Sequence, residues 1–209
     1  VNTKNFAIKD GLRYAANLFK DNHVFGGIAT VTILMALAQG GINVLFLPFL
    51  LKVVKASEVQ FGIVLAFQGM GSVIGSILVG AYSNYSKANW IIGGGALFSG
   101  IALLIYTTFP ILNLVLVIAF LEGITIMGVF IFIPSLVQKY FKEENLGKVF
   151  GFLDSFESGS FLISMGLSGI LSEIWGMRLT FYILAILYLI AGIVGICILR
   201  KGKLENNNI

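Results

Sequence analysis

The sequence predicts an all-α membrane protein with six transmembrane helices. Its composition, the length of its apolar runs and the placement of its charges each support this prediction. Hydrophobic residues make up 57% of the 209 residues and charged residues only 11%, whereas soluble domains are roughly half apolar and a quarter charged. The charges stand in short clusters separated by long runs that carry almost none. Runs of this length are typical of membrane spans.

Six apolar runs are long enough to cross a bilayer, because a helical span needs about 20 residues at about 1.5 Å rise per residue. The segments between the runs are short and mostly polar, so consecutive helices are expected to be antiparallel neighbours. Together they predict a six-helix transmembrane bundle over residues 25–200. The predicted spans cover residues 26–51, 61–82, 90–107, 111–137, 149–171 and 179–199.

The two ends of the chain flank this bundle. Residues 1–24 are expected to form a cytoplasmic loop with an amphipathic interfacial helix, because apolar residues from Ile8 to Phe19 recur at helical spacing. A plain loop is the alternative. No apolar stretch precedes Gly26, so we expect no cleavable secretory signal. Residues 201–209 are polar and are expected to form a disordered cytoplasmic tail.

The lysine and arginine residues predict the orientation, because short cytoplasmic loops of membrane proteins retain positive charge. With both termini in the cytoplasm, eleven of the 14 basic residues lie on the cytoplasmic side. Only Lys52, Lys55 and Arg178 then lie outside. We therefore expect a multi-pass protein of the inner (cytoplasmic) membrane. No nucleic-acid partner is expected, because the basic residues flank the spans and form no stripe.

Three acidic residues fall inside the predicted spans, where a charge must face a cavity or a partner. Glu122 lies eleven residues into its span, about 17 Å deep and close to the bilayer centre. Asp154 and Glu157 lie one turn apart on one helix face. A carboxyl group removed from water favours its neutral form, so all three are candidate proton or substrate sites. A hydrogen bond to a neighbouring helix that makes the fold specific would explain Glu122 equally well. For Asp154 and Glu157, the alternative is an ion pair with Lys148.

Polar amides and aromatic rings in the spans are candidates for lining a cavity. Gln39 and Asn43 are four residues apart and share a helix face, and Gln68 lies in the second predicted span. Interhelical hydrogen bonding explains the three amides nearly as well. Phenylalanine is abundant enough to line a pocket for an amphipathic molecule. Most of these rings are nevertheless expected to face lipid or to pack against other helices. The rings considered are Phe46, Phe49, Phe67, Phe130, Phe132, Phe156 and Phe161.

Small residues recur at helical spacing in two spans and predict close helix packing or gating. Lipid supplies no hydrophobic drive between helices, so close association depends on residues that let backbones approach. Static packing is the alternative to sliding, and it accounts for most motifs of this kind. The candidate ridges are Gly71 with Gly75, Ser72 with Ser76 and Gly80, and Gly151 with Ser155 and Gly159.

Enzymatic activity is not expected from this sequence. The single histidine, His23, lies outside the predicted spans and Asp154 is the single aspartate within them, so neither a Ser-His nor an Asp-Asp dyad can form there. The single cysteine, Cys197, excludes a disulfide or a thiolate metal site within the chain. Residues 69–75 lack the spacing of a dinucleotide fingerprint, and Lys148 is not part of a Walker A sequence. No metal or cofactor is expected.

Four passages of the sequence carry a family resemblance: Asp10 to Tyr14, Phe61 to Gly80, Gln138 with Gly147 to Gly151, and Gly166 to Gly176. They resemble the Major Facilitator Superfamily, and within it the bacterial branch of macrolide-efflux-type and enterobactin-exporter-type proteins. The resemblance covers nearly the whole chain and corresponds to helices seven to twelve of a twelve-helix transporter. It implies one half of that fold, with an N-terminal six-helix bundle missing from this chain as its partner.

The resemblance implies the C-terminal half of a secondary active transporter. The expected activity is proton-coupled efflux of a lipophilic or amphipathic small molecule by alternating access, with membrane lipid around the bundle. A non-transporting scaffold or receptor, or a transporter for another solute, is the alternative. In the superfamily, a Gly-x-x-x-Asp-Arg-type motif latches the cytoplasmic side. Here Gly80 is followed by Asn84 and Tyr85 in those places, and only Lys87 is basic, so the latch is expected to be weakened.

Overall fold

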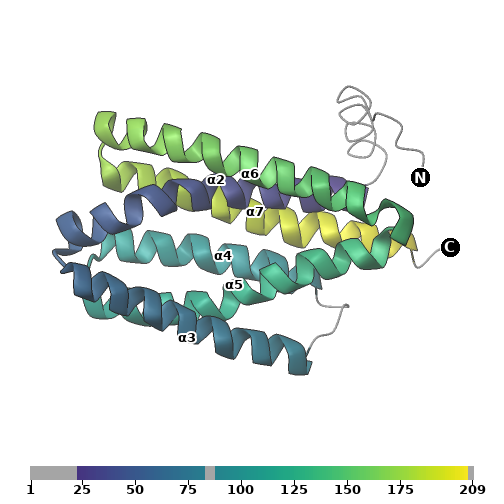
Figure 1. Cartoon of the computed structure of the whole chain (residues 1–209), viewed down its shortest axis with the longest axis horizontal. Helices are drawn as coiled ribbons and strands as arrows, with labels where there is room; N and C mark the ends of the chain where they lie inside the picture. Colours follow the sequence, from purple (N-terminus) through teal and green to yellow (C-terminus); the bar gives the residue numbers. More distant parts are fainter. Residues whose placement is uncertain (1–22, 83–87, 207–209) are drawn as a thin grey trace, which may run out of the picture.

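The computed structural model describes residues 23–82 and 88–206, and within these ranges the chain forms six long α-helices that lie side by side (Figure 1). This confirms the predicted all-α fold. The interfacial helix predicted within residues 1–24 lies almost entirely outside the described residues. The elements are α2 (His23–Phe49), the π-helical turn η1 (Leu50–Val54), α3 (Glu58–Tyr82), α4 (Ala88–Thr108), α5 (Leu112–Tyr140), α6 (Glu143–Ile174) and α7 (Met177–Asn206).

Five of these helices are long and apolar enough to span a membrane: α2 with η1, α3, α4, α5 and α7. The chain is therefore an integral membrane protein. The helix α6, predicted as the span 149–171, is more polar than the others and carries Asp154 and Glu157. Its 32 residues extend about 48 Å, and it runs along α2 at the edge of the bundle (Figure 1). A polar helix in this position requires that its polar face be shielded from lipid.

The first helix ends in a π-helical turn. Pro48 lacks a backbone N–H, which interrupts the regular hydrogen-bond ladder, and the turn that follows extends the helix to Val54. Lys55 adopts a left-handed conformation with φ of 61° and ends the turn. Ser57 and Gln60 then start α3 with reciprocal bonds between side chain and backbone, of 2.8 and 3.3 Å, which form a capping box.

The last helix is longer than predicted. It continues to Asn206, so it includes residues 201–206, which were expected to belong to a disordered tail over residues 201–209. No proline follows Leu199, and the single Gly202 costs a helix only about 1 kcal/mol. The helix therefore propagates past the end of the apolar run.

The helices pair in a fixed pattern: α3 with α5, α4 with α7, and α2 with both α6 and α7 (Figure 1). Glycines allow the backbones of α3 and α5 to approach closely. A Cβ at Gly71 would overlap the carbonyl oxygen of Phe120, and one at Gly75 would overlap that of Ile124. Since these obstacles are backbone atoms, the two helices approach as closely as glycine allows.

Other predicted small-residue contacts are absent from the described chain. A Cβ at Gly80, Gly151 or Gly159 would meet nothing within 4 Å among the described residues, so these three glycines make no close contact with a described helix. Asn84 and Lys87 lie in residues 83–87, outside the described ranges, so the structure does not place the predicted latch.

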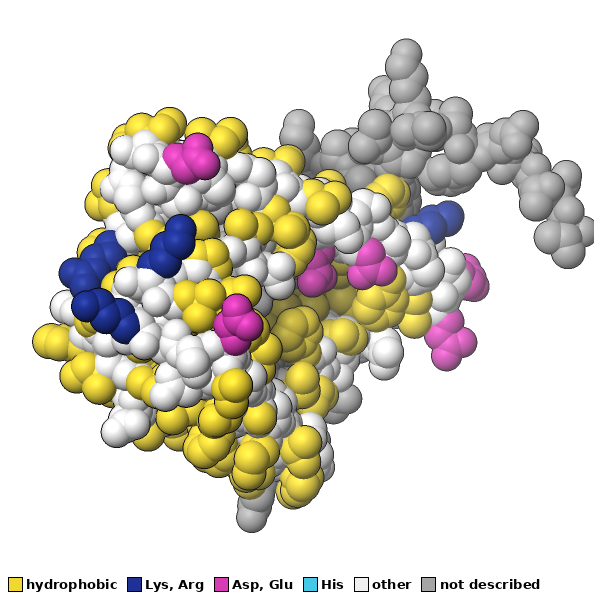
Figure 2. Space-filling view, turned by 60° about the vertical axis from the view of Figure 1, so that its left-hand side comes forward, with side chains coloured by type: hydrophobic (Ala, Val, Ile, Leu, Met, Phe, Trp, Pro, Cys, Tyr) yellow, Lys and Arg dark blue, Asp and Glu magenta, His cyan; other side chains and the backbone are white. Residues whose placement is uncertain are grey.

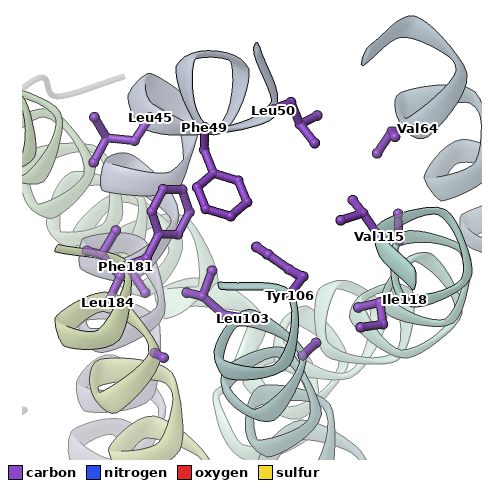
Figure 3. Packing of buried hydrophobic residues seen from close by; sticks show 14 of the residues in the cluster. Leu45, Phe49, Leu50, Val64, Leu103, Tyr106, Val115, Ile118, Phe181 and Leu184 are labelled. Atoms are coloured by element: carbon purple, nitrogen blue, oxygen red, sulfur yellow. The ribbon is translucent and has the colours of Figure 1, made fainter. Parts of the chain in front are cut away.

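Two clusters of buried side chains hold the ends of the bundle. At one end, Phe49, Tyr106 and Phe181 join α2, α4 and α7 (Figure 3). The ring centroids lie 4.8 Å apart for Phe49 and Phe181 and 5.9 Å apart for Phe49 and Tyr106, distances at which aromatic pairs add about 1 kcal/mol to burial. The second cluster includes Phe25, Ile92, Phe132 and Val149. The two clusters hold the helices that frame the groove described next.

Candidate functional site: an acidic groove

A groove of 310 Å³ lies between α2, α5 and α6. Its walls are mainly apolar, and Figure 2 shows acidic side chains beside a hollow in the apolar surface. The volume is at the lower end of the range of small-molecule sites, about 300–1,000 Å³. The lining residues are Thr32, Met35, Ala36 and Gln39 of α2; Ile126, Val129, Phe130, Ile133 and Pro134 of α5; Phe150, Leu153, Asp154, Glu157 and Phe161 of α6; and Tyr188 of α7.

The groove exists because α6 is held by α2 and not by α5. A Cβ at Gly40 of α2 would overlap the carbonyl oxygen of Phe161, so these helices meet at backbone distance. The Ser164 hydroxyl also donates a hydrogen bond from α6 to the carbonyl oxygen of Leu37. In contrast, α5 and α6 follow each other in sequence but pack weakly together. The space between them remains open, and the side chains of α6 line it.

Asp154 and Glu157 bring two carboxylates into this space. Both side chains are exposed, and they lie three residues apart on one face of α6. No lysine, arginine or histidine is among the described residues that line the groove. Like charges at this spacing repel each other. The groove therefore presents concentrated negative charge within apolar walls.

Gln39 connects the groove to the interior of the bundle. The hydroxyl of Tyr188, which is 1% exposed, donates a hydrogen bond of 2.6 Å to Gln39 Oε1. This bond leaves the amide nitrogen of Gln39 available at the groove surface. Thr32 lies about two turns away on the same face of α2. It is 7% exposed, and its hydroxyl has no hydrogen-bond partner among the described residues.

Glu122 does not line the groove. It lies one turn of α5 before Ile126, which does, and two turns before Phe130 on the same face. Its carboxyl group lies near the buried Ser99 and in the neighbourhood of Tyr188. Glu122 is therefore placed just beyond the end of the groove, and Tyr188 lies near Glu122 and donates a hydrogen bond to Gln39.

The other predicted polar residues do not share this site. Asn43 is exposed one turn beyond Gln39 but is not among the lining residues. Gln68 is part of the contact between α3 and α5, where its carbonyl oxygen packs against Gly123 and accepts a 3.0 Å hydrogen bond from Ser72. Of the three amides considered together, only Gln39 lines the groove.

Thr32 and Tyr188 were not predicted from the sequence as site residues. Thr32 is seven residues from Gln39, a spacing that places both on one helix face, so a search for polar side chains on that face would have found it. Tyr188 carries a hydroxyl inside a mostly apolar span, but its pairing with Gln39 joins residues 149 positions apart. Periodicity within one helix carries no information about such a contact.

The comparison with known proteins agrees with this architecture. Residues 28–208 match the Major Facilitator Superfamily, a range that reaches from the first turns of α2 to the end of α7. No curated protein matches the chain. Major facilitator proteins are membrane transporters that bind small-molecule substrates. The match extends over the bundle of membrane-spanning helices and over the groove on one side of it. The chain therefore belongs to the Major Facilitator Superfamily.

Proposed function

We propose that this chain is the C-terminal six-helix half of a secondary active transporter that exports a lipophilic or amphipathic small molecule in exchange for protons. The proposal places it in the inner (cytoplasmic) membrane with both termini in the cytoplasm, as the distribution of basic residues favours. The observation that carries it is the groove, in which Asp154 and Glu157 face apolar walls. Ionisable groups within a membrane bundle are costly, so they are typical of substrate and proton pathways.

The groove walls suit a molecule with a large apolar body. Phe130 is 57% exposed, and it faces the groove together with Phe150 and Phe161. Covering such rings with a ligand contributes about 25 cal/mol for each Å² of apolar surface removed from water. Polar contacts in the groove then orient the ligand. Small-molecule sites usually combine apolar walls with a few polar groups that fix orientation.

The second half of the transporter would cover the open side of this groove. The ridge of Gly151, Ser155 and Gly159 on α6 has no partner among the described helices. On α3, Val73 and Ile77 are 61% and 65% exposed. An N-terminal six-helix bundle packed on these faces would enclose the groove, and rocking of the two bundles would open it to each side in turn.

Glu122 is the proposed proton site. It lies beyond the end of the groove, so a ligand against Phe130 and a proton on Glu122 can be bound at separate positions along α5. Coupling requires that each ligand change the affinity for the other, and such linkage is reciprocal. Tyr188, which lies near Glu122 and is hydrogen-bonded to Gln39 in the groove, is the residue that we propose to connect the two positions.

The proposal is tested with the complete gene product in inside-out membrane vesicles that have an acidic interior. Three fluorescent amphiphiles cover the possible charges: cationic rhodamine 6G, neutral Nile red and anionic anilinonaphthalene sulfonate. We expect accumulation of at least one dye with matching proton release. Glu122→Gln should abolish the coupled flux, whereas Glu173→Gln, at an exposed acid of α6 outside the groove, should not. Unchanged proton-coupled flux in Glu122→Gln rules out the proton role.

The scaffold or receptor alternative makes the opposite prediction. A protein of that class would bind a dye without moving it, and no proton release would accompany binding. Binding without flux for all three dyes would therefore favour the scaffold over the transporter.

A further inference from the structure

We propose that the groove between α2, α5 and α6 selects organic cations. In this arrangement the positive centre of the ligand lies at Asp154 and Glu157, and its aromatic or aliphatic body lies against Phe130, Phe150 and Phe161. The inference rests on the proposed function, since it names the charge class of the transported molecule, but it concerns binding and not flux.

The charge balance of the lining supports a cation. Asp154 and Glu157 form no ion pair with any residue that the structure describes, and the described lining contains no basic side chain to neutralise them. Apolar walls lower the local dielectric, which strengthens both the repulsion between the two carboxylates and their attraction for a positive ligand. A cation of charge one or two relieves this repulsion, whereas an anion increases it.

Thr32 is an independent indication of a bound molecule. Its hydroxyl is buried in the groove wall, and it donates to and accepts from nothing in the described chain. Buried polar groups almost always have a partner, so a group without one calls for an explanation. The Gln39 amide nitrogen is available about two turns along the same helix face. A ligand with a polar portion would provide partners for both groups.

The aromatic walls suit the same class of molecule. Phe130 stands on α5 and Phe161 on α6, so rings approach the groove from two helices that otherwise pack weakly together. Aromatic faces attract cations, and organic cations with diffuse charge lose little hydration when they enter such a site. Small inorganic cations would leave these walls unused, and the described residues contain no group of three His, Cys, Asp or Glu side chains placed to hold a metal ion.

The test uses two ions of nearly identical size and shape but opposite charge, tetraphenylphosphonium and tetraphenylborate. Their dissociation constants for the purified complete gene product in detergent are measured by equilibrium dialysis without a proton gradient. We expect tetraphenylphosphonium to bind at least about tenfold more tightly than tetraphenylborate. The double variant Asp154→Asn with Glu157→Gln should lose this preference, and Glu173→Gln should keep it.

Equal affinity for the two ions, or an unchanged tetraphenylphosphonium affinity in the double variant, overturns the inference. Nile red binding and a monodisperse elution profile verify that the double variant is folded, because a neutral probe depends on the apolar walls alone. A protein that prefers the phosphonium ion but shows no proton-coupled flux refutes the proposed function and not this inference. A protein that exports only neutral or anionic dyes refutes this inference and leaves the transporter proposal standing.

Discussion

The contact between α3 and α5 allows a quantitative prediction, because glycine is required there for a visible reason. The nearest neighbours of a Cβ at Gly71 would be the carbonyl oxygen and carbon of Phe120 and the amide nitrogen of Ile124. None of these atoms can rotate away, since all belong to the helix backbone. Gly71→Ala must therefore push α3 and α5 apart. The same seam positions Gly123, the neighbour of Glu122, so its opening also disturbs the proposed proton site.

The expected cost follows from two opposing effects. Alanine gains up to about 1 kcal/mol over glycine through helix propensity. Overpacking costs typically about 1–3 kcal/mol, and a rigid backbone obstacle favours the upper part of that range. We expect Gly71→Ala to lower the free energy of unfolding by about 2 kcal/mol relative to Gly69→Ala, which obtains the same propensity gain on the same helix. A Cβ at Gly69 meets nothing within 4 Å among the described residues.

The assay is reversible unfolding in mixed micelles with increasing sodium dodecyl sulfate, followed by circular dichroism. Both variants are compared with the parent protein at the same total detergent concentration. If Gly71→Ala and Gly69→Ala unfold at the same point, the two helices do not meet at backbone distance. The description of this seam would then be wrong.

Two further substitutions test the site and the core. Tyr188→Phe removes the 2.6 Å hydrogen bond to Gln39 Oε1 and should lower the free energy of unfolding by about 1 kcal/mol in the same assay. Tyr182→Phe, at an exposed 3.3 Å contact, should lower it by less. Equal effects of the two substitutions would contradict the buried pairing of Tyr188 with Gln39. Phe49→Ala empties the centre of the aromatic cluster and should cost about 3–5 kcal/mol, whereas Phe109→Ala, at a ring that is 59% exposed, should leave the unfolding midpoint almost unchanged.

The polar helix α6 explains why the proposed site lies where it does. Its mean apolarity is too low for a lipid-exposed span, and it has glycines, serines and two carboxylates on faces that meet no described helix. Contact with α2 hides only one side of it. The remaining polar surface lines the groove or faces the side on which we propose a second bundle. A helix of this composition is stable in a membrane only when such partners exist.

The six helices and their approximate positions were predictable from the amino-acid sequence alone. The length of an apolar run is a local property, and the bilayer requires that each such run satisfy its own backbone hydrogen bonds, which makes it a helix. Helix ends were less predictable, because α2 passes through Pro48 as a π-helical turn and α7 continues to Asn206. Neither feature depends on hydrophobicity.

Which polar residues come together in one site depends on how the helices pack in three dimensions. Its depth within a span made Glu122 the leading candidate for a proton or substrate site. The groove is nevertheless lined by Asp154 and Glu157. The reason is that the close contact of Gly40 with Phe161 sets the position of α6 beside α2. The same pairing places α6 next to Gln39, while the half-buried Gln68 belongs to the contact between α3 and α5. Side-chain periodicity specifies the faces of a single helix. Which faces meet depends on packing between helices that are distant in sequence, and a single sequence does not encode that pairing in any local pattern.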